Sequence, residues 1–499
     1  MIAIGIDYGS TNSLVASFAR EIFGAIPITH QKSDVTYNCE YIRSPKRLLH
    51  NIDAISQDDI NKICRCIEIC VSQLLSTHVD RYKSDYSHAS IAITVPNAFK
   101  DSQCKILKHI VESNIRSILK ANGVASTIEL SIIPEPIAAA LYFAYAMDGT
   151  GSLGCEQYIV VSDVGGGTTD LAIVKAMSNR GQFEFEVLNT EHMFELGGND
   201  IDNAIADSLV AKHPELRDID RDTLVRACCE LKKGFSKYNG QSYSQQAVLD
   251  DSGEFLMVNG NPVILEMSID ELRTVLSQGD NFLAKYKALA SRLKDRFPAP
   301  SSPDVYLLPI GGTSRLGLVR DALKEVFHEY SHGEVTLHTE DDSIGRYDSV
   351  VRGAAIYAAY KGRLISGNVV IKNRTMHRIS LHFGSNKLHE CVGECFSDGD
   401  YTHVCKCEPT YLDEKSGTFK IGGVRFYQGG RSTYVDDDCE VLCDITVDDT
   451  LYTHGRPLED IVVKVTLAIH QGRLRSVTIC AEGCGADGKD YIKRFDCNI

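Results

Sequence analysis

The chain has 499 residues, more than one hydrophobic core usually accommodates, so we expect about two to four domains or subdomains. Its net charge of −15 argues against nucleic acid or an anionic membrane as the main partner. The apolar share of 43% is ordinary for a soluble globular protein, and the 17 cysteines, with no visible export signal, read as free thiols, so we expect a cytoplasmic protein.

The first predicted element is a strand pair joined by a polar turn. The stretch "IAIGIDYGSTNSLVASF" (residues 2–18) contains an apolar run, Asp7, a glycine, hydroxyl residues and a second apolar run. The stretch "VSDVGGGTTDLAIV" (161–174) repeats this order, with Asp163 in the place of Asp7. We therefore predict an internal repeat of two antiparallel strands with a tight turn.

Two strand-to-helix units separate the copies. "ASIAITVP" (89–96) predicts a strand followed by a helix, and "IELSIIPEP" (128–136) predicts a strand followed by a helix that opens near Glu135. The apolar run that begins at Ile137 is too short for the roughly 20 residues of a membrane span, so it predicts a buried helix.

Further glycine turns follow the second copy. "HMFELGGNDIDNAIADSLV" (192–210) changes from strand to helix at Gly197 and Gly198, and a helical span follows around "ELKKGFS" (230–236). "DVYLLPIGGTSRLGLV" (304–319) reads as a strand, a Gly311-Gly312 turn and a helix. A last helix ends near Gly362.

From about Ile379 the chain alternates apolar and polar residues with period two, which predicts an all-β, sandwich-like module. We therefore expect a first domain over residues 1–362, a linker over 363–378 and a β-rich domain over 379–499.

The glycine turns have a common chemical use. Backbone N–H groups of a turn without side chains converge on an anion, and neighbouring hydroxyls add donors. Asp7 and Asp163 would repel a phosphate unless a cation lies between them, and Mg²⁺ supplies that cation. Two such turns therefore predict a clamp on a metal-bound polyphosphate, and the third turn at Gly311 and Gly312 predicts an approach to a nucleoside or α-phosphate.

These motifs resemble the DnaK-type (70-kDa heat-shock protein) chaperones of the actin-like ATPase superfamily. "IGIDYGSTNS" and "VSDVGGGTTDLAIV" resemble the two phosphate loops of that family, and "SPKRLL", "LGGNDID", "ELKKGFS" and "IGGTSRLGLVRDAL" resemble its other nucleotide-site segments. The resemblance implies a two-lobed α/β actin-like (ribonuclease H-like) ATPase domain over residues 1–362, followed by a small β domain. It also implies ATP or ADP, Mg²⁺, K⁺ as a further ion, slow ATP hydrolysis and a role in the stress response.

The resemblance also assigns roles to single residues. Asp7 and Asp163 would hold Mg²⁺, and Lys46 would lie against the γ-phosphate. Glu135 and Thr168 would orient the attacking water, with Asp163 in the same catalytic group. The family's nucleotide contacts map onto Gly9, Ser10, Thr11, Asn12, Gly165, Gly166, Gly167, Thr168, Gly197, Gly198, Lys232, Lys233, Ser236, Gly311, Gly312, Thr313, Arg315 and Asp348.

Simpler interpretations of two of these residues stay open. Lys46 alone fits a solvated surface lysine equally well, and Glu135 fits an acid stabilised by the positive end of a helix.

Departures from the family concern its partners. Ser131, Pro134 and Ile137 stand where the family has the arginine, asparagine and threonine implicated in J-domain docking, which argues against ordinary J-domain stimulation. Cys104 replaces an arginine of the interdomain relay. A nucleotide exchange factor and a peptide or protein client remain the implied partners. We expect no helical lid after the β module, which either adds a peptide as an extra strand or docks on one dedicated partner.

The β-rich region holds nine of the 17 cysteines, in the pairs Cys391/Cys395, Cys405/Cys407, Cys439/Cys443 and Cys480/Cys484, with Cys497 beyond them. Pairs at these spacings allow a Zn²⁺ site, while core packing or redox sensing explains them without a metal.

The sequence therefore predicts an ATP-binding, slowly hydrolysing chaperone-like protein. The alternatives are a nucleotide-gated scaffold without a peptide release cycle, a small-molecule kinase of the same fold and a filament-forming protein.

Overall fold

The computed structural model describes residues 2–9, 12–18, 28–32, 35–37, 40–42, 56–82, 88–97, 99, 101–122, 127–150, 156–179, 182–237, 242–250, 252–258, 260–279, 281–297, 305–330, 336–337, 348–372, 379–383, 388–392, 399–406, 410–413, 415–429, 439–457, 460–470 and 473–497. Contacts divide the chain into two compact units, Met1–Val370 and Ile371–Ile499. Among the described helices, none is both long enough and apolar enough to span a membrane.

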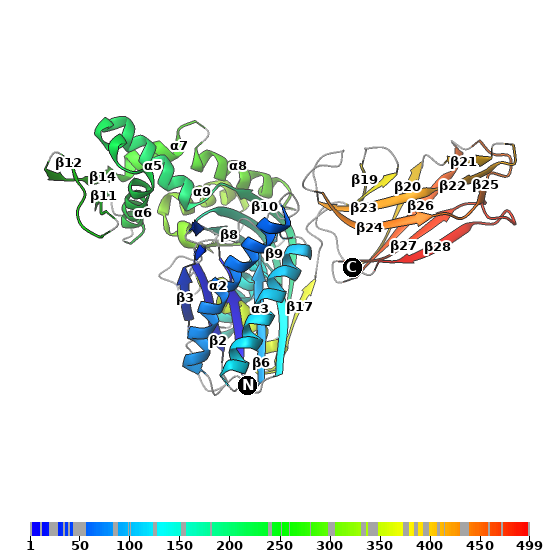
Figure 1. Ribbon diagram of the computed structural model, residues 1–499, viewed down its shortest axis with the longest axis horizontal. Helices are drawn as coiled ribbons and strands as arrows, with labels where there is room; N and C mark the ends of the chain where they lie inside the picture. Colours follow the sequence, from blue (N-terminus) through cyan, green and yellow to red (C-terminus); the bar gives the residue numbers. More distant parts are fainter. Residues whose placement is uncertain are drawn as a thin grey trace. The chain divides into compact units, whose positions relative to one another are not determined.

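The first sheet of the first unit contains the first predicted hairpin, in the order β3-β2-β1-β6-β7. Its strands are β1 (Ile2–Asp7), β2 (Asn12–Phe18), β3 (Ile28–Lys32), β6 (His88–Val95) and β7 (Thr127–Pro134). β1 runs antiparallel to β2 and parallel to β6. Figure 1 shows the strands β2, β3 and β6 of this sheet in shades of blue. The short strands β4 (Val35–Tyr37) and β5 (Glu40–Ile42) form a separate pair.

The two faces of β1 pack against different helices because successive side chains of a strand point to opposite sides. Ile4 and Ile6 lie in a core with residues of α2 (Gln57–Tyr82) and α3 (Asp101–Ala121). Gly5 faces α10 (Ser349–Lys361), where an added Cβ would lie 2.3 Å from the Val351 carbonyl oxygen. The absence of a side chain at Gly5 therefore allows α10 to lie directly on the strand.

The second sheet contains the second predicted hairpin, in the order β16-β15-β8-β9-β10-β17. Its strands are β8 (Gln157–Val164), β9 (Thr168–Asn179), β10 (Gln182–Phe194), β15 (Val305–Ile310), β16 (Thr336–Leu337) and β17 (Asn368–Lys372). β8 runs antiparallel to β9 and parallel to β15, as β1 does to β2 and β6. The predicted repeat is therefore present as two hairpins of equal topology.

Two helices of the first unit pack closely against each other. α4 (Glu135–Thr150) begins directly after β7 and packs against α10. A Cβ at Gly353 of α10 would lie 1.7 Å from the Ala138 carbonyl oxygen of α4. The two helices therefore approach each other at a distance that only glycine permits at this position.

A helical layer follows the second hairpin and surrounds the largest core of the described residues. It contains α5 (Gly198–Lys212), η3 (Pro214–Asp218), α6 (Arg221–Lys237), α7 (Ile269–Ser277), α8 (Phe282–Asp295), η4 (Gly312–Arg315), α9 (Gly317–Phe327) and η5 (His328–Tyr330). Its core includes Ile173 of β9, Ile205 of α5, Leu231 of α6 and Leu289 of α8. Beside it lie two small strand pairs, β11 (Tyr243–Ala247) with β14 (Ile264–Ser268), and β12 (Met257–Val258) with β13 (Asn261–Pro262).

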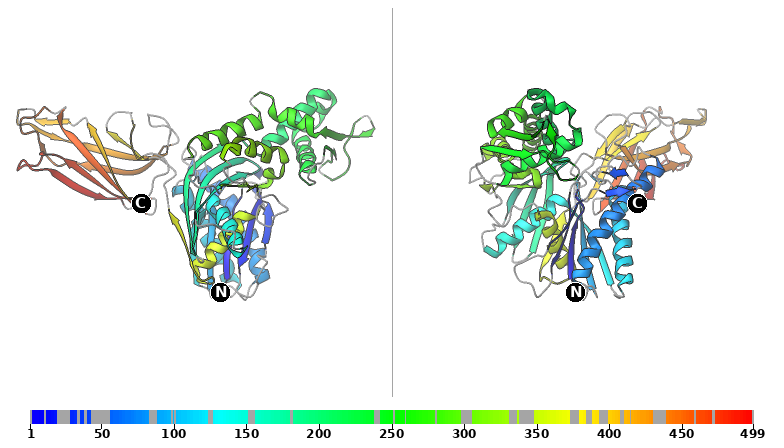
Figure 2. Two further views of the ribbon diagram at one scale, coloured as in Figure 1. Left: turned by 180° about the vertical axis from the view of Figure 1, so that it is seen from behind. Right: turned by 60° about the vertical axis from the view of Figure 1, so that its left-hand side comes forward.

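The described part of the second unit consists mainly of strands and contains no α-helix. The strands are β18 (Ile379–Phe383), β19 (Leu388–Val392), β20 (Gly399–Lys406), β21 (Thr410–Asp413), β22 (Thr418–Lys420), β23 (Gly422–Gly429), β24 (Cys439–Val447), β25 (Leu451–Tyr452), β26 (Val462–His470), β27 (Arg473–Ala481) and β28 (Tyr491–Asp496). Figure 2 shows them, in yellow to red, running beside one another.

Two four-stranded sheets dominate this unit, in the orders β19-β18-β23-β24 and β20-β26-β27-β28, with a smaller sheet β21-β22-β25. One core takes Leu381 and Phe426 from the first sheet and Val465 and Ile479 from the second. The two larger sheets therefore bury their apolar faces against each other. Strand β17, which pairs with β10, lies within the predicted linker 363–378, so part of that segment is an edge strand.

Candidate functional site

The first predicted turn begins at Asp7, the last residue of β1. The hydroxyl of Thr94, at the end of the neighbouring strand β6, donates a hydrogen bond of 3.0 Å to Asp7 Oδ1. Thr94 is fully buried while Asp7 is partly exposed, so the sheet holds the carboxylate at a surface. Gly9 follows as a partly buried residue. Ser10, Thr11 and Lys46 lie outside the described residues, as does the side chain of Asn12 at the start of β2.

The second predicted turn connects β8 and β9. Asp163 pairs with Asp170 in the register of the hairpin, and Gly165 N donates to the Thr168 carbonyl oxygen at 3.0 Å. Thr168 is partly buried at the start of β9. Next to it, the hydroxyl of buried Thr169 donates to the Leu196 carbonyl oxygen at 2.5 Å. The hairpin is therefore tied to the segment that carries the Gly197-Gly198 turn.

The third predicted turn lies directly against the second. Gly311 has φ 81, and an added Cβ would lie 2.4 Å from Asp163 Oδ1 and 2.5 Å from the Val164 carbonyl oxygen. A glycine is required there both for this backbone conformation and for this close approach. The parallel pairing of β15 with β8, which places Ile310 beside Asp163, produces the contact.

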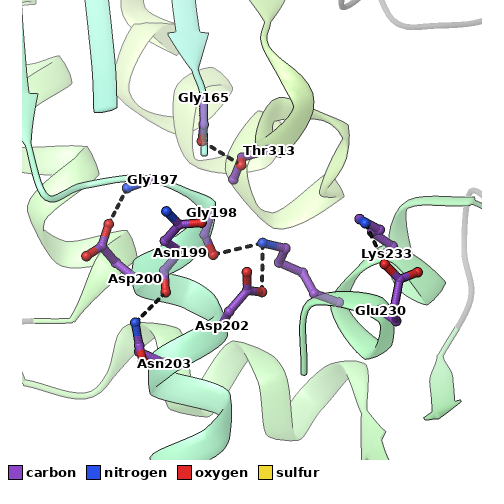
Figure 3. Close-up of polar contacts among 11 residues, drawn as sticks. Gly165, Gly197, Gly198, Asn199, Asp200, Asp202, Asn203, Glu230, Lys233 and Thr313 are labelled. Atoms are coloured by element: carbon purple, nitrogen blue, oxygen red, sulfur yellow. Dashed lines mark hydrogen bonds and ion pairs between the residues drawn. The ribbon is translucent and has the colours of Figure 1, made fainter. Parts of the chain in front are cut away.

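The Gly197-Gly198 turn joins the same cluster. Gly198 N donates to the Gly165 carbonyl oxygen at 3.0 Å, and Asn199 N donates to the Gly166 carbonyl oxygen at 2.7 Å. The Thr313 hydroxyl donates to the same Gly165 oxygen at 2.8 Å (Figure 3). Three turns that are far apart in the sequence therefore meet at the carbonyl oxygen of Gly165.

The start of α5 is capped by its own side chain. Asp200 Oδ2 accepts a hydrogen bond of 2.7 Å from Gly197 N, as Figure 3 shows. The N–H groups of Gly198 and Asn199 are donated to the second turn and hold it in place, while the N–H group of Gly197 is donated to its own helix.

A buried ion pair lies beside this cluster. Lys232 Nζ of α6 lies 2.8 Å from Asp202 Oδ1 of α5 and donates to the Gly198 carbonyl oxygen at 2.8 Å. Burial raises the pKa of the Asp202 carboxyl more than the neighbouring ammonium lowers it. The predicted site residue Lys232 therefore reaches the glycine turns and ties α6 to them.

The remaining predicted residues lie on neighbouring elements. On α6, Lys233 pairs with Glu230 at 2.6 Å, and Ser236 is partly buried. Arg315 is exposed at the end of η4. Glu135 is buried at the first position of α4.

Asp348 is buried at the N-cap position of α10, without a side-chain capping bond. Its Oδ2 pairs with Arg352 at 2.9 Å, while Oδ1 has no hydrogen-bond partner among the described residues. A buried carboxylate oxygen without a partner carries a desolvation cost, so this position suits a ligand that donates a hydrogen bond.

Sequence reasoning missed two residues that position the site. Asp202 is the fourth residue after Gly198, so it lies one helical turn into α5, and its partner Lys232 is on another helix. Thr94 carries a hydroxyl group in strand β6, whose sequence is mostly apolar. A polar residue within an apolar run was the available signal for Thr94.

The donor set suits Mg²⁺ bound with a polyphosphate. Asp7 and Asp163 each end or nearly end a strand, and a magnesium ion held by one or two carboxylates takes its other ligands from water and phosphate oxygens. Among the described residues, no group of three or more histidine, cysteine or acidic side chains could hold a metal alone. This applies to the described cysteines of the second unit as well. Of the predicted zinc pairs, Cys395 and Cys407 lie outside the described residues, as do the side chains of Cys405 and Cys439.

One comparison with known proteins assigns the family. A family model described as Hsp70 protein matches residues 67–392, which is more than half of the chain. The match includes the second and third turns, α5 and α6, and begins after the first turn and Lys46. Members of this family have an actin-like ATPase fold and bind ATP as chaperones. The chain therefore belongs to the Hsp70 family and to the actin-like ATPase superfamily.

Proposed function

We propose that this chain binds ATP and ADP with Mg²⁺, hydrolyses ATP slowly and changes its affinity for a peptide or protein partner with the bound nucleotide. The observation that carries the proposal is the meeting of three glycine turns at the Gly165 carbonyl oxygen, beside Asp163. These internal hydrogen bonds fix the glycine backbone of the second turn beside the Asp163 carboxylate, and a metal-bound polyphosphate needs such a fixed turn next to an acid.

In this proposal the acids at the strand ends hold the metal. Asp7, oriented by Thr94, and Asp163, against Gly311, would bind Mg²⁺ through its water shell. When bound, Mg²⁺ supplies charge neutralisation for the phosphates. The turn Gly165–Thr168 would contact the phosphates, and Glu135 and Thr168 would orient the attacking water. Lys46 stays a predicted contact of the γ-phosphate.

The nucleoside would lie against η4 and α6. Gly312 leaves open space, because an added Cβ would have no neighbour within 4 Å among the described residues. Arg315 is exposed next to it, where its planar guanidinium could stack on a base. Ser236 and Lys233 on α6 complete the proposed nucleoside contacts. Lys232 of the same helix holds the Gly197-Gly198 turn through its hydrogen bond to the Gly198 carbonyl oxygen.

Mutation of Asp163 tests ATP hydrolysis. We expect Asp163→Asn to lower Mg²⁺-dependent phosphate release by about 100-fold or more, since it removes one charge from the metal site. The matched control is Asp58→Asn, an exposed acid of α2. Equal turnover in both variants and the native protein would refute the proposed site.

The β-strand unit is the proposed partner-binding part. Its sheet β20-β26-β27-β28 ends in two edge strands, and each presents an apolar side chain to solvent: Val404 of β20 is 56% exposed and Ile492 of β28 is 65% exposed. An extended peptide could pair with such an edge and place alternate side chains against these residues.

A test of this edge compares two lysine variants. Ile492→Lys should weaken binding of a fluorescent unfolded peptide by about 10-fold, while Thr446→Lys, an exposed position of β24, should leave it unchanged. Peptide binding that is insensitive to Ile492→Lys would contradict the use of the β28 edge.

A second candidate, a nucleotide-gated scaffold, is favoured by the positions that depart from the family. Ile137 is 2% exposed within α4, and the Ser131 hydroxyl donates to the Ile91 carbonyl oxygen at 3.1 Å. A buried isoleucine and a hydroxyl that bonds within the sheet replace the threonine and the arginine that the resemblance assigns to docking, which weakens the support for a J-domain partner. The family match favours both candidates over a small-molecule kinase.

Peptide affinity in the two nucleotide states separates the candidates. A chaperone cycle predicts binding at least about 10-fold weaker with ATP than with ADP, whereas a scaffold without release predicts equal affinities. Fluorescence anisotropy of one labelled peptide with the full-length chain measures both.

A further inference from the structure

The second unit contains two cysteines whose sulfurs touch. The Cys497 thiol donates to Cys443 Sγ at a sulfur–sulfur distance of 3.1 Å, although the residues are 54 positions apart in the sequence. A disulfide requires about 2.05 Å, so the sulfurs need to approach by about 1 Å to form one. The sequence spacings grouped Cys443 with Cys439 instead, and gave no partner to Cys497.

The backbone holds both cysteines in these positions. The register between β23 and β24 shifts where Phe426 pairs with Cys443 and Tyr427 with Val441, so a bulge directs Cys443 toward the core. Cys497 N donates to the Arg475 carbonyl oxygen of β27 at 2.8 Å, which ties the segment after β28 to its sheet. This backbone hydrogen bond therefore fixes the position of Cys497 beside Cys443.

The pair bridges the outer edges of two facing sheets. β24 is the last strand of the sheet β19-β18-β23-β24, and Cys497 directly follows β28, the last strand of β20-β26-β27-β28. A covalent bond between them would fasten the two sheets together at one side of their shared core.

The two thiols differ in a way that suits stepwise oxidation. Cys443 is partly exposed, while Cys497 is 4% exposed. Burial, followed by the contact with Cys443, raises the pKa of the Cys497 thiol well above its usual range. An oxidant from solution therefore meets Cys443 first, and Cys497 reacts as the second thiol. Among the described residues, no third metal-ligating side chain joins the pair.

We propose that Cys443 and Cys497 form a reversible disulfide by exchange with an oxidised low-molecular-weight disulfide such as oxidised glutathione. The Cys443 thiolate attacks one glutathione sulfur, forms a mixed disulfide and releases one glutathione thiolate. Cys497 then loses its proton, attacks Cys443 Sγ and releases the second glutathione thiolate. The cysteine pair loses two electrons and two protons, and one oxidised glutathione becomes two reduced molecules.

Peptide mapping of the full-length chain tests the bond. The protein is equilibrated with oxidised glutathione, its remaining thiols are alkylated, and tryptic peptides are analysed by mass spectrometry. We expect a disulfide between the peptide 432–464, which carries Cys439 and Cys443, and the peptide 495–499, which carries Cys497. Reduction with dithiothreitol followed by alkylation should give both peptides separately, with their cysteines alkylated.

Matched variants assign the sulfurs. Cys439→Ser, on the same strand and the same tryptic peptide, should keep the cross-link, and Cys443→Ser should abolish it. If the bond forms, oxidation should raise the Tm of the second unit by about 10 °C in the native protein and in Cys439→Ser, because it closes a long loop. Neither Cys497→Ala nor Cys443→Ser should show an oxidation-dependent shift.

Two results would overturn the proposal. One is complete alkylation of Cys443 and Cys497 after equilibration with oxidised glutathione. The other is a cross-link that survives in Cys443→Ser, which would assign the reactive thiol to Cys439.

Discussion

Replacing Gly197 by alanine tests whether the glycine turns act as one nucleotide site. Gly197 has φ −160 and ψ −166, an extended conformation open to any residue, so backbone strain does not enter. An alanine Cβ would lie 2.7 Å from the carbonyl carbon and oxygen of Gly166 and 2.8 Å from Gly167 N. The substitution therefore acts by pressing on the backbone of the second turn.

The size of the effect follows from this overlap. An ordinary contact begins near 3.4 Å, so the turn must move by about 0.7 Å, and overpacking of this kind costs about 1–3 kcal/mol. If the turn holds the phosphates, much of that cost appears as lost affinity, about 10-fold to 100-fold for ATP with Mg²⁺.

Titration calorimetry measures this loss, and thermal unfolding checks that the variant is folded. The matched control is Gly317→Ala, at the start of α9, where an added Cβ has no neighbour within 4 Å and ATP affinity should stay unchanged. A folded Gly197→Ala protein with native ATP affinity would refute the assignment of this turn to a nucleotide site.

Three further substitutions test separate parts of the account. Thr313→Val removes the hydrogen bond to the Gly165 carbonyl oxygen and should weaken ATP binding by about 5-fold in calorimetry, in line with about 1 kcal/mol; unchanged binding would count against the shared turn. Gly353→Ala should lower the free energy of unfolding of the first unit by about 3 kcal/mol in urea, because its Cβ would overlap the Ala138 carbonyl; native stability would contradict the close helix contact. Glu271→Gln tests the capping box at the start of α7. Hydrogen bonds from Lys212 and Ser268 lower the pKa of Glu271 from 4.5 to about 2. The stabilisation by the capping box, about 1 kcal/mol, is therefore complete above pH 4.5 and is lost as the pH falls through about 2. Urea unfolding of both proteins at pH 6 and pH 2.5 should show a clearly smaller difference at pH 2.5, where part of the stabilisation is lost, and a difference that grows on acidification would reverse the assigned sign.

Local patterns made the hairpins and their turns predictable. An apolar run that ends in an acid and glycines depends on neighbouring residues only, and the structure places Asp7 and Asp163 at or next to the ends of β1 and β8. The contact of Gly311 with Asp163 depends on the parallel pairing of β15 and β8, which no local pattern encodes.

Other features depend on tertiary packing and could not be predicted from the sequence. Asp202 of α5 and Lys232 of α6 form an ion pair between two helices. In the sequence, each of them resembles an ordinary charged residue of a helix. The edge strand β17 has the short, polar-flanked sequence that also suits a linker. The contact between Cys443 and Cys497 could not be predicted from short spacings, because distant strands bring the thiols together.

Titration of the full-length chain with ATP, in Mg²⁺ and then in excess chelator, tests the central claim most directly. The account predicts saturable binding with Mg²⁺ that weakens by about 10-fold or more in chelator and in Asp163→Asn, since the acid and the phosphates share the ion. An absence of binding heat and of any ATP-dependent rise in Tm, or an affinity indifferent to both Mg²⁺ and Asp163, would contradict it.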